Sequence, residues 1–243
     1  MSKTLVIMPT YNESMNIMHS IEELFKFNPG LHLLVVDDNS PDGTAEIVET
    51  AKSDFGGKLF LLSRPGKAGL GPAYLAGFAW AFERDYIRVV EMDADGSHRA
   101  SDLPALLAQE DFDLVIGSRW ISGGEVVNWP IVRELISRFG NLYTRTLLNT
   151  KVRDMTAGFR VYKTALLKRL PLEKIASQGY SFQVEMAYRS IELDAKVTEV
   201  PIVFVEREYG ASKMNTAIVL EALWLVTRWG VARLLGKKHF ADF

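Results

Sequence analysis

Residues 86–98 read YIRVVEMDADGSH, an apolar run that ends in two carboxylates one residue apart. The run YIRVVEM (86–92) predicts a buried strand, and Asp93, Asp95 and His98 follow its end. Two like charges this close together repel, so either a cation or open water must compensate for them. The stretch therefore raises the question of what binds where this strand ends.

The sequence on both sides of this stretch alternates between strand and helix patterns. Further apolar runs predict strands at residues 4–8, 31–36, 58–63 and 112–117. Helical patterns lie between the strands, at residues 13–27, 45–52, 72–83 and near 101–109. This alternation indicates an α/β fold, with a mostly parallel sheet and helices on both faces. No linker divides the chain, so we expect one domain over residues 1–236 and a short tail at 237–243.

Composition excludes several classes of protein. The 243 residues are 48% hydrophobic and 24% charged, which is typical of a globular rather than a disordered chain. A formal net charge of -2 gives no basic excess for binding nucleic acid. The chain has no cysteine, so disulfides are excluded and a reducing compartment fits. We find no signal-peptide pattern and no uninterrupted apolar stretch of transmembrane length, and we expect a cytoplasmic location.

Polar segments follow each of the first four predicted strands: PTYNE (9–13), DDNSPDGT (37–44), RPGKAGLG (64–71) and DADGSH (93–98). In open α/β sheets, ligands bind outside the carboxyl ends of the strands. Taken singly, Asp37, Asp38 and Asp42 are equally well explained as turn or helix-capping residues. Their placement together with the other segments favours a nucleotide site at this edge of the sheet.

The two carboxylates after the fourth strand suit a hard divalent cation, Mg²⁺ or Mn²⁺. An ion held by Asp93 and Asp95 could bridge to a diphosphate and neutralise it as a leaving group. Either Ser97 or a water would complete the coordination shell. We expect His98 to support the site rather than to bind the ion directly.

Several of these motifs resemble a known family. PTYNE, VVDDNSPDGT, GLGPAY and MDADGSH resemble the nucleotide-sugar domain of family-two glycosyltransferases, which have the GT-A fold. Five downstream segments are similar to those of dolichol- or polyprenol-phosphate mannose synthases: GSRWISGG (117–124), NWPIVRELISR (128–138), DMTAGFRVY (154–162), GYSFQVEM (179–186) and VPIVFVEREYGASKM (200–214). The resemblance implies transfer of mannose from GDP-mannose to a polyprenyl monophosphate, with a divalent metal.

The same resemblance assigns roles to individual residues. It implies nucleotide-sugar contacts for Pro9, Tyr11, Glu13, Val36, Asp38, Asp93, Ala94, Asp95, Arg119, Arg207 and Lys213. It implies an acceptor-phosphate site at Arg133 and Ser137, and a metal site at Asp93, Asp95 and Ser97. Of all these, Asp95, Arg119 and Arg207 are the residues expected to take part in catalysis.

The expected reaction is consistent with simple acid–base chemistry. A phosphate monoester has a second pKa of about 6, so it is already a nucleophile and needs no base. It needs cations beside it, which Arg119, Arg133, Arg207 and Lys213 supply. Arg207 follows a predicted strand, VPIVFV (200–205). Direct displacement by the phosphate would invert the sugar carbon.

Other functions stay open at this stage. Transfer of glucose or another sugar is the main alternative, because local geometry decides which epimeric hydroxyl is recognised. A non-catalytic nucleotide-sugar sensor would not need the acceptor cations. A membrane scaffold would leave the carboxylates at the strand end unexplained.

The segment 215–236 predicts a long apolar helix near the C-terminus. Glu221 and two arginines interrupt it, so we do not expect a full membrane span. Trp224 and Trp229 suit an amphipathic helix that lies in a membrane interface. Packing on the domain or on a partner explains the same pattern equally well. We therefore expect peripheral association with the cytoplasmic face of a membrane, through lipid or through a membrane-protein partner.

Overall fold

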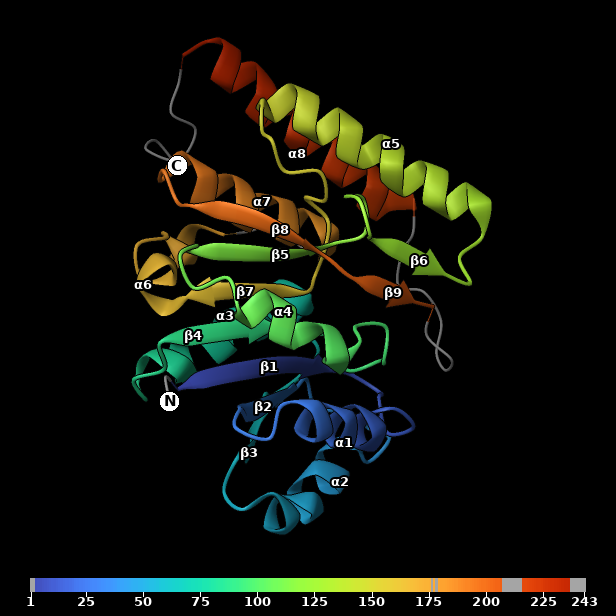
Figure 1. Ribbon diagram of the computed structural model, residues 1–243, viewed down its shortest axis with the longest axis vertical. Helices are drawn as coiled ribbons and strands as arrows, with labels where there is room; N and C mark the ends of the chain where they lie inside the picture. Colours follow the sequence, from blue (N-terminus) through green and yellow to red (C-terminus); the bar gives the residue numbers. More distant parts are fainter. Residues whose placement is uncertain (1–2, 176, 178, 207–215, 237–243) are drawn as a thin grey trace.

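The computed structural model describes residues 3–175, 177, 179–206 and 216–236, and Figure 1 shows a central sheet between layers of helices. The strands of the main sheet are β1 (Thr4–Thr10), β2 (His32–Asp37), β3 (Leu59–Ser63), β4 (Arg88–Glu91), β5 (Leu114–Ser118), β7 (Arg160–Lys163) and β8 (Val197–Pro201). They are ordered β3-β2-β1-β4-β7-β5-β8, and β7 alone of these is antiparallel to its neighbours. The predicted mostly parallel α/β sheet with helices on both faces is confirmed.

The helices fall close to their predicted positions. The α-helices are α1 (Ile17–Phe27), α2 (Thr44–Ala51), α3 (Leu70–Phe82), α4 (Leu103–Leu107), α5 (Ile131–Leu148), α6 (Thr164–Leu167), α7 (Gly179–Glu192) and α8 (Thr216–Leu234). Short 3-10 turns are η1 (Lys52–Phe55), η2 (Ala100–Asp102) and η3 (Leu172–Lys174). The helix predicted from residue 13 begins only at Ile17, because Asn12 has a positive φ of 60° and the residues after it form a turn.

One predicted strand is wrong in its extent. The run 200–205 is divided between β8, in the main sheet, and β9 (Val203–Val205), which pairs with β6 (Glu125–Val127) in a separate two-stranded sheet. Pro201 ends β8, and proline has no N–H with which to continue a ladder. The separate pair carries the chain away from the main sheet.

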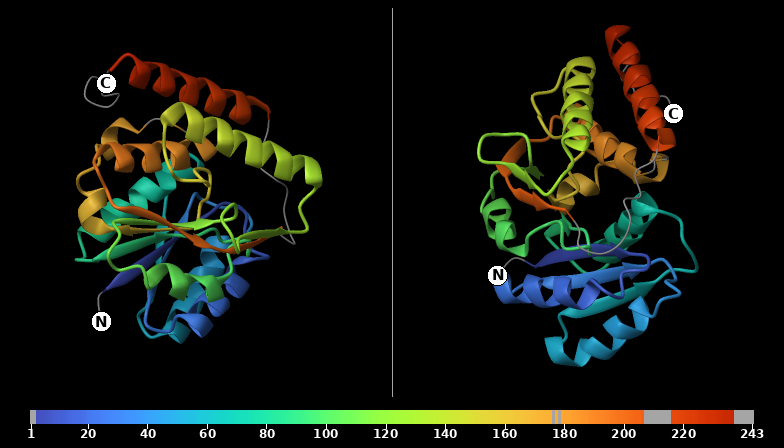
Figure 2. Two further views of the ribbon diagram at one scale, coloured as in Figure 1. Left: turned by 45° about the horizontal axis from the view of Figure 1, so that its top comes forward. Right: turned by 90° about the vertical axis from the view of Figure 1, so that its right-hand side faces the viewer.

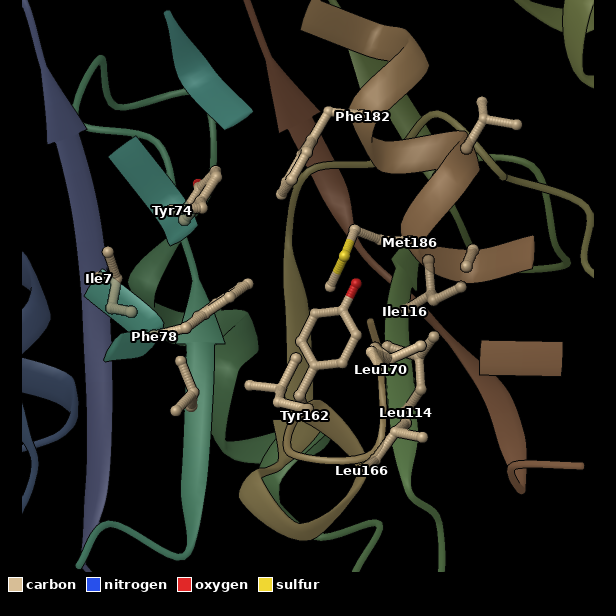
Figure 3. Close-up of a cluster of buried hydrophobic side chains, with 14 of the residues drawn as sticks. Ile7, Tyr74, Phe78, Leu114, Ile116, Tyr162, Leu166, Leu170, Phe182 and Met186 are labelled. Carbon is tan, nitrogen blue, oxygen red and sulfur yellow. The ribbon is translucent and has the colours of Figure 1, made fainter. Parts of the chain in front are cut away.

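The sheet is apolar on both faces, which is why its strands read as continuous hydrophobic runs. Leu5 and Ile7 of β1 belong to one core cluster with residues of α3 and α7. Val6 and Met8 belong to the other, with residues of α1, α2 and α4. Figure 3 shows part of the first cluster, with side chains from α3, α7 and the strands directed toward one another. Burial on both faces fixes the sheet and so fixes the loops at its edge.

The strand order has its switch point at β1. The chain runs from β1 outward to β2 and β3, and then returns to place β4 on the other side of β1. Ligands of open α/β sheets bind at such a switch point. Met92 and then Asp93 follow the end of β4, which places the two carboxylates at this switch point, which we call the crevice.

Helices α5 and α8 pack side by side at one end of the molecule, beyond the edge strand β8 (Figures 1 and 2). Trp229 of α8 is 4% exposed and stacks on Tyr188 of α7, with ring centroids 6.2 Å apart. The hydroxyls of Tyr143 and Thr227 form a 2.6 Å hydrogen bond between α5 and α8. The C-terminal helix is therefore anchored to the rest of the protein.

Candidate functional site

The turn after β4 holds both carboxylates at the open edge of the sheet. Gly96 has a φ of +77°, a conformation that glycine adopts without strain, and it turns the chain back on itself. Oδ1 of Asp95 accepts hydrogen bonds from the Ser97 hydroxyl (2.5 Å) and the Ser97 N–H (3.1 Å). Asp93 and Asp95 both stay partly exposed to solvent. The geometry thus presents two oriented carboxylates to a ligand.

His98 braces this turn from behind. Its Nδ1 accepts a 3.0 Å hydrogen bond from the Asp93 N–H, which leaves the proton of a neutral ring on Nε2. The ring is 3% exposed and stacks on Phe159 at 5.0 Å between centroids. Burial lowers the pKa of His98 and outweighs the opposing effect of the Asp93 carboxylate. As expected from the sequence, His98 supports the carboxylates rather than presenting a nitrogen to an ion.

The donor set fits a divalent ion that takes most of its ligands from elsewhere. In the described part of the chain, no group of three or more His, Cys, Asp or Glu side chains is arranged to hold a metal. Two partly exposed carboxylates suit Mg²⁺ or Mn²⁺, which commonly keep waters and bind substrate phosphates. Ser97 is 2% exposed and donates its hydroxyl proton to Asp95, so it orients that carboxylate, and the metal roles of Asp93, Asp95 and Ser97 stay predictions.

The loops after β1 and β3 meet across the crevice. Pro9 lies near the end of β1, and the Lys67 ammonium of the glycine-rich loop lies 4.2 Å from the centroid of the Tyr11 ring. The carboxylate of Glu13 accepts a 2.9 Å hydrogen bond from the Asn16 side chain. The structure therefore brings an aromatic face and a cation together where the resemblance implies a nucleoside.

Asp38 holds the glycine-rich loop in place. It is 4% exposed, and its oxygens accept hydrogen bonds from Arg64 (2.5 Å) and from the N–H groups of Ala68 (3.0 Å) and Gly69 (3.2 Å). The side chain of Val36 is fully buried in the core, so it shapes the strand end from inside. The Asp38 carboxylate is therefore engaged by donors of the protein itself. A contact with base or ribose stays a prediction for both Val36 and Asp38.

The other two carboxylates of this segment act as turn residues. Asp37 accepts hydrogen bonds from the hydroxyls of Thr10 (2.8 Å) and Ser40 (2.6 Å). Oδ1 of Asp42 accepts from the N–H and the hydroxyl of Thr44, at the start of α2. Burial alone would raise the pKa of Asp42, but these and neighbouring hydrogen bonds lower it. The contacts of Asp37 and Asp42 are therefore those of turn or helix-capping residues.

Arg119 forms a buried ion pair that the sequence did not reveal. Its Nε and Nη2 donate to the two carboxylate oxygens of Asp154 at 2.8 and 2.7 Å. Arg119 is 5% exposed and Asp154 is fully buried. Burial alone would raise the pKa of Asp154, but the Arg119 guanidinium holds it below its ordinary value. The two residues are far apart in the sequence, so no local spacing could predict the pair.

Three rings form what we call the aromatic wall: Trp120, Trp129 and Phe204. The Arg119 guanidinium lies 5.4 to 5.5 Å from each ring centroid. Phe204 also meets the His98 ring at 5.4 Å, edge to face. The indole N–H groups of both tryptophans are buried without a hydrogen-bond partner in the described residues. The wall therefore connects the carboxylate turn to the start of α5.

The two predicted acceptor residues lie beside this wall on α5. The Arg133 guanidinium lies 4.0 Å from the Trp129 centroid and is paired with the Glu206 carboxylate. Ser137 is one helical turn further on, and its carbonyl accepts from the buried Asn141 side chain. Arg207 and Lys213 lie outside the described residues, so their roles stay predictions.

Sequence reasoning missed a buried acid directly behind the carboxylate turn. Glu91, the last residue of β4, is fully buried, and burial raises its pKa to about 8 despite the nearby Arg160. The Arg160 guanidinium and the Gln183 side chain both act against this rise. The available signal was a glutamate within an otherwise apolar strand.

Comparison with known proteins identifies close relatives. The family described as "Glycosyl transferase family 2" matches this chain over residues 5–171. The chain is 48% identical over 231 residues to undecaprenyl-phosphate mannosyltransferase of Micrococcus luteus, covering 95% of each chain. It is 44% identical over 231 residues to polyprenol monophosphomannose synthase of Mycolicibacterium smegmatis, covering 94% of this chain and 87% of that one.

Solved structures of more distant proteins share the fold. Glucosyl-3-phosphoglycerate synthase from Mycobacterium tuberculosis, in a complex with Mn²⁺, UDP and glucosyl-3-phosphoglycerate, superposes with a TM-score of 0.63 at 22% identity. That match covers 97% of this chain and 79% of the other. Residues 1–349 of TarS from S. aureus give a TM-score of 0.63 at 21% identity, covering 97% of this chain and 66% of the other. The fold is the GT-A type that the sequence motifs predicted.

Proposed function

Because the chain belongs to glycosyl transferase family 2, we propose that it transfers mannose from GDP-mannose to a polyprenyl monophosphate. The observation that carries the proposal is the similarity, over nearly the whole chain, to two proteins named for mannose transfer to polyprenyl phosphates. The carboxylate turn at the sheet edge supplies a place for the donor diphosphate. The apolar surface of α5 and α8 supplies a place for a lipid.

On the donor side, Asp93 and Asp95 would hold Mg²⁺ or Mn²⁺, which would neutralise the charge of the departing diphosphate. Ser97 keeps the Asp95 carboxylate oriented, and His98 keeps the turn in place. Support for a metal comes also from the distant structural relative, whose complex contains Mn²⁺ and UDP. Tyr11 offers an aromatic face to the base at the other side of the crevice.

On the acceptor side, the phosphate oxygen is the nucleophile, and the protein's task is to hold two anions together. Arg133 is the described cation best placed for this, because it is at the start of α5 beside the aromatic wall. Its partner Glu206 would release it when the acceptor phosphate binds. Arg119 is neutralised by Asp154, so we assign it a positioning role behind the wall. A single displacement inverts the sugar carbon and needs no covalent intermediate.

The lipid acceptor implies a membrane nearby. Helix α5 exposes Ile131, Val132, Leu135, Ile136, Phe139 and Leu142, and α8 exposes Leu220, Trp224, Val231 and Leu234. Contiguous exposed apolar surface of this kind marks a protein or membrane contact. None of the helices in the described residues is long and apolar enough to cross a membrane. We infer peripheral binding to the cytoplasmic face, with residues 1–236 acting as a single catalytic domain.

A panel of nucleotide sugars tests the donor. GDP-mannose, UDP-glucose and UDP-N-acetylglucosamine would each be incubated with undecaprenyl phosphate, with Mn²⁺ or with a chelator. We expect a mannosyl lipid to form from GDP-mannose only, and only with metal. Preferred use of UDP-glucose would show that GDP-mannose is not the donor. Full activity with the chelator would show that the reaction needs no metal.

A further inference from the structure

A second polar site lies on α5, apart from the carboxylate turn. It is a pocket of about 180 Å³ lined by Trp120, Arg138, Asn141, Leu142, Arg145 and Arg153. We call it the arginine pocket. The contacts of these side chains show what kind of ligand it would accept.

The arginine pocket carries excess positive charge. Arg138 donates to Glu134 at 2.7 Å and lies 4.2 Å from the Trp120 centroid. Within the described residues, neither Arg145 nor Arg153 has a carboxylate at ion-pair distance. Glu199 lies beside the backbone of Arg153 and accepts N–H groups with both its oxygens, one of them from Arg153 at 2.8 Å. Three guanidinium groups set against the carboxylates of Glu134 and Glu199 leave one net positive charge, so the pocket is complementary to an anion.

The lining of the pocket suits a phosphate group. Guanidinium forks match the oxygens of phosphate, which they bind through paired hydrogen bonds. The volume of about 180 Å³ leaves room for such a group. The Asn141 amide donates to the Ser137 carbonyl and the Thr156 hydroxyl and accepts from the Met155 N–H. These hydrogen bonds hold it as a rigid wall of the pocket.

The surroundings of the pocket specify what the phosphate is attached to. Leu142 lines the pocket and is 52% exposed, and Phe139 on the same helix is 66% exposed. A phosphate bound here would have an apolar surface directly beside it. We propose that the arginine pocket binds the headgroup phosphate of an anionic phospholipid and so seats α5 on the membrane. This goes beyond the transfer reaction and holds for any donor sugar.

The test uses the full chain with Arg145→Gln and Arg153→Gln together. Binding would be measured by co-sedimentation with vesicles of equal parts phosphatidylcholine and phosphatidylglycerol, and with phosphatidylcholine alone. Loss of two cations near an anionic surface should weaken binding to the mixed vesicles about thirtyfold. Mannosyl transfer to detergent-dispersed undecaprenyl phosphate should not change, which also shows that the variant is folded. The matched control replaces two exposed cations elsewhere, Lys26→Gln with Arg84→Gln.

Two further measurements distinguish specific binding of a phospholipid headgroup from non-specific charge attraction and from binding of free phosphate. Arg145→Lys with Arg153→Lys keeps the charge but loses the guanidinium forks, and should still weaken binding several-fold. Equal loss in the control pair, or full binding by the lysine pair, would overturn the proposal in favour of diffuse attraction. If inorganic phosphate raises the unfolding midpoint of the wild type only, while vesicle binding is the same in all variants, the pocket holds free anions and the lipid assignment is wrong.

Discussion

At the scale of single residues, the carboxylates of the crevice differ in what they bind. Asp37, Asp38 and Asp42 accept hydrogen bonds that hold turns and neighbouring loops in place, whereas Asp93 and Asp95 lie partly exposed at the strand end. All five follow strands, so the sequence could predict where they gather. It could not predict which of them hold loops, because that depends on donors contributed by other segments.

Replacing Asp95 should reduce the transfer reaction strongly. Asp95→Ala removes a proposed metal ligand but little buried surface, so transfer should fall about a hundredfold or more while the unfolding midpoint stays unchanged. Turnover and thermal unfolding would be measured together. Asp111→Ala, at an exposed position in a loop, is the matched control and should keep full activity. A variant that unfolds early would instead show that Asp95 is structural.

The Arg119–Asp154 pair leads to a prediction about stability and pH. Removing one partner of a buried ion pair leaves an uncompensated charge, so Arg119→Ala should lower the free energy of unfolding by about 3–5 kcal/mol at pH 7. The folded pKa of Asp154 lies below its ordinary 3.8, so the pair stabilises the fold above that pH. This stability is lost as the pH falls from about 4 toward the folded pKa.

Denaturant unfolding of wild type and Asp154→Asn between pH 3 and pH 7 measures this effect. The wild type should lose more stability than the variant at the acid end of the range. Parallel curves for the two proteins would show that the carboxylate does not titrate with folding.

Replacing Arg133 should weaken binding of the acceptor but not of the donor. Arg133→Ala removes the cation beside Trp129 but touches none of the four nucleotide loops, so KM for polyprenyl phosphate should rise while the affinity for GDP stays the same. Calorimetric titration with GDP and steady-state kinetics with a short polyprenyl phosphate would decide it. Arg88→Ala, whose guanidinium pairs with the exposed Glu110 away from α5, is the control for loss of an arginine. Equal losses of donor and acceptor binding would place Arg133 in the donor site or in the fold.

At the scale of elements, the strands and helices of the first half were predictable because each carries its own apolar period. The pairing of β6 with β9 was not, since each strand is three residues long and their partners are distant in sequence. Likewise, an apolar α8 was compatible with both lipid and protein contacts. The structure shows one face packed on α5 and α7 and another face exposed.

Two tryptophans of α8 separate these two faces. Trp229 is 4% exposed, so Trp229→Ala should lower the free energy of unfolding by about 3–5 kcal/mol. Trp224 is 60% exposed, so Trp224→Ala should change it by no more than about 0.5 kcal/mol but should weaken vesicle binding. Urea unfolding and co-sedimentation of both variants would be compared. A strong loss of stability in Trp224→Ala would mean that the exposed face is covered by protein.

At the scale of the whole molecule, the sheet order places its switch point at β1 and β4, and helices α5 and α8 expose apolar side chains at one end of the molecule. The class of the fold and the crevice followed from the alternation of strands and polar segments. The connection between the carboxylate turn and α5 did not. It depends on the aromatic wall, whose rings come from three segments brought together only by folding.

Two acceptors that differ only in the phosphate show whether a lipid phosphate, and not an alcohol, attacks the sugar. GDP-mannose labelled in the sugar would be incubated with the protein, Mn²⁺ and either undecaprenyl phosphate or undecaprenol, and the label extracted into lipid would be measured. We expect label in lipid with the phosphate and none with the alcohol, because we assign no base that would activate a hydroxyl. Equal labelling of the alcohol, or no labelling of the phosphate by a folded protein, would contradict it.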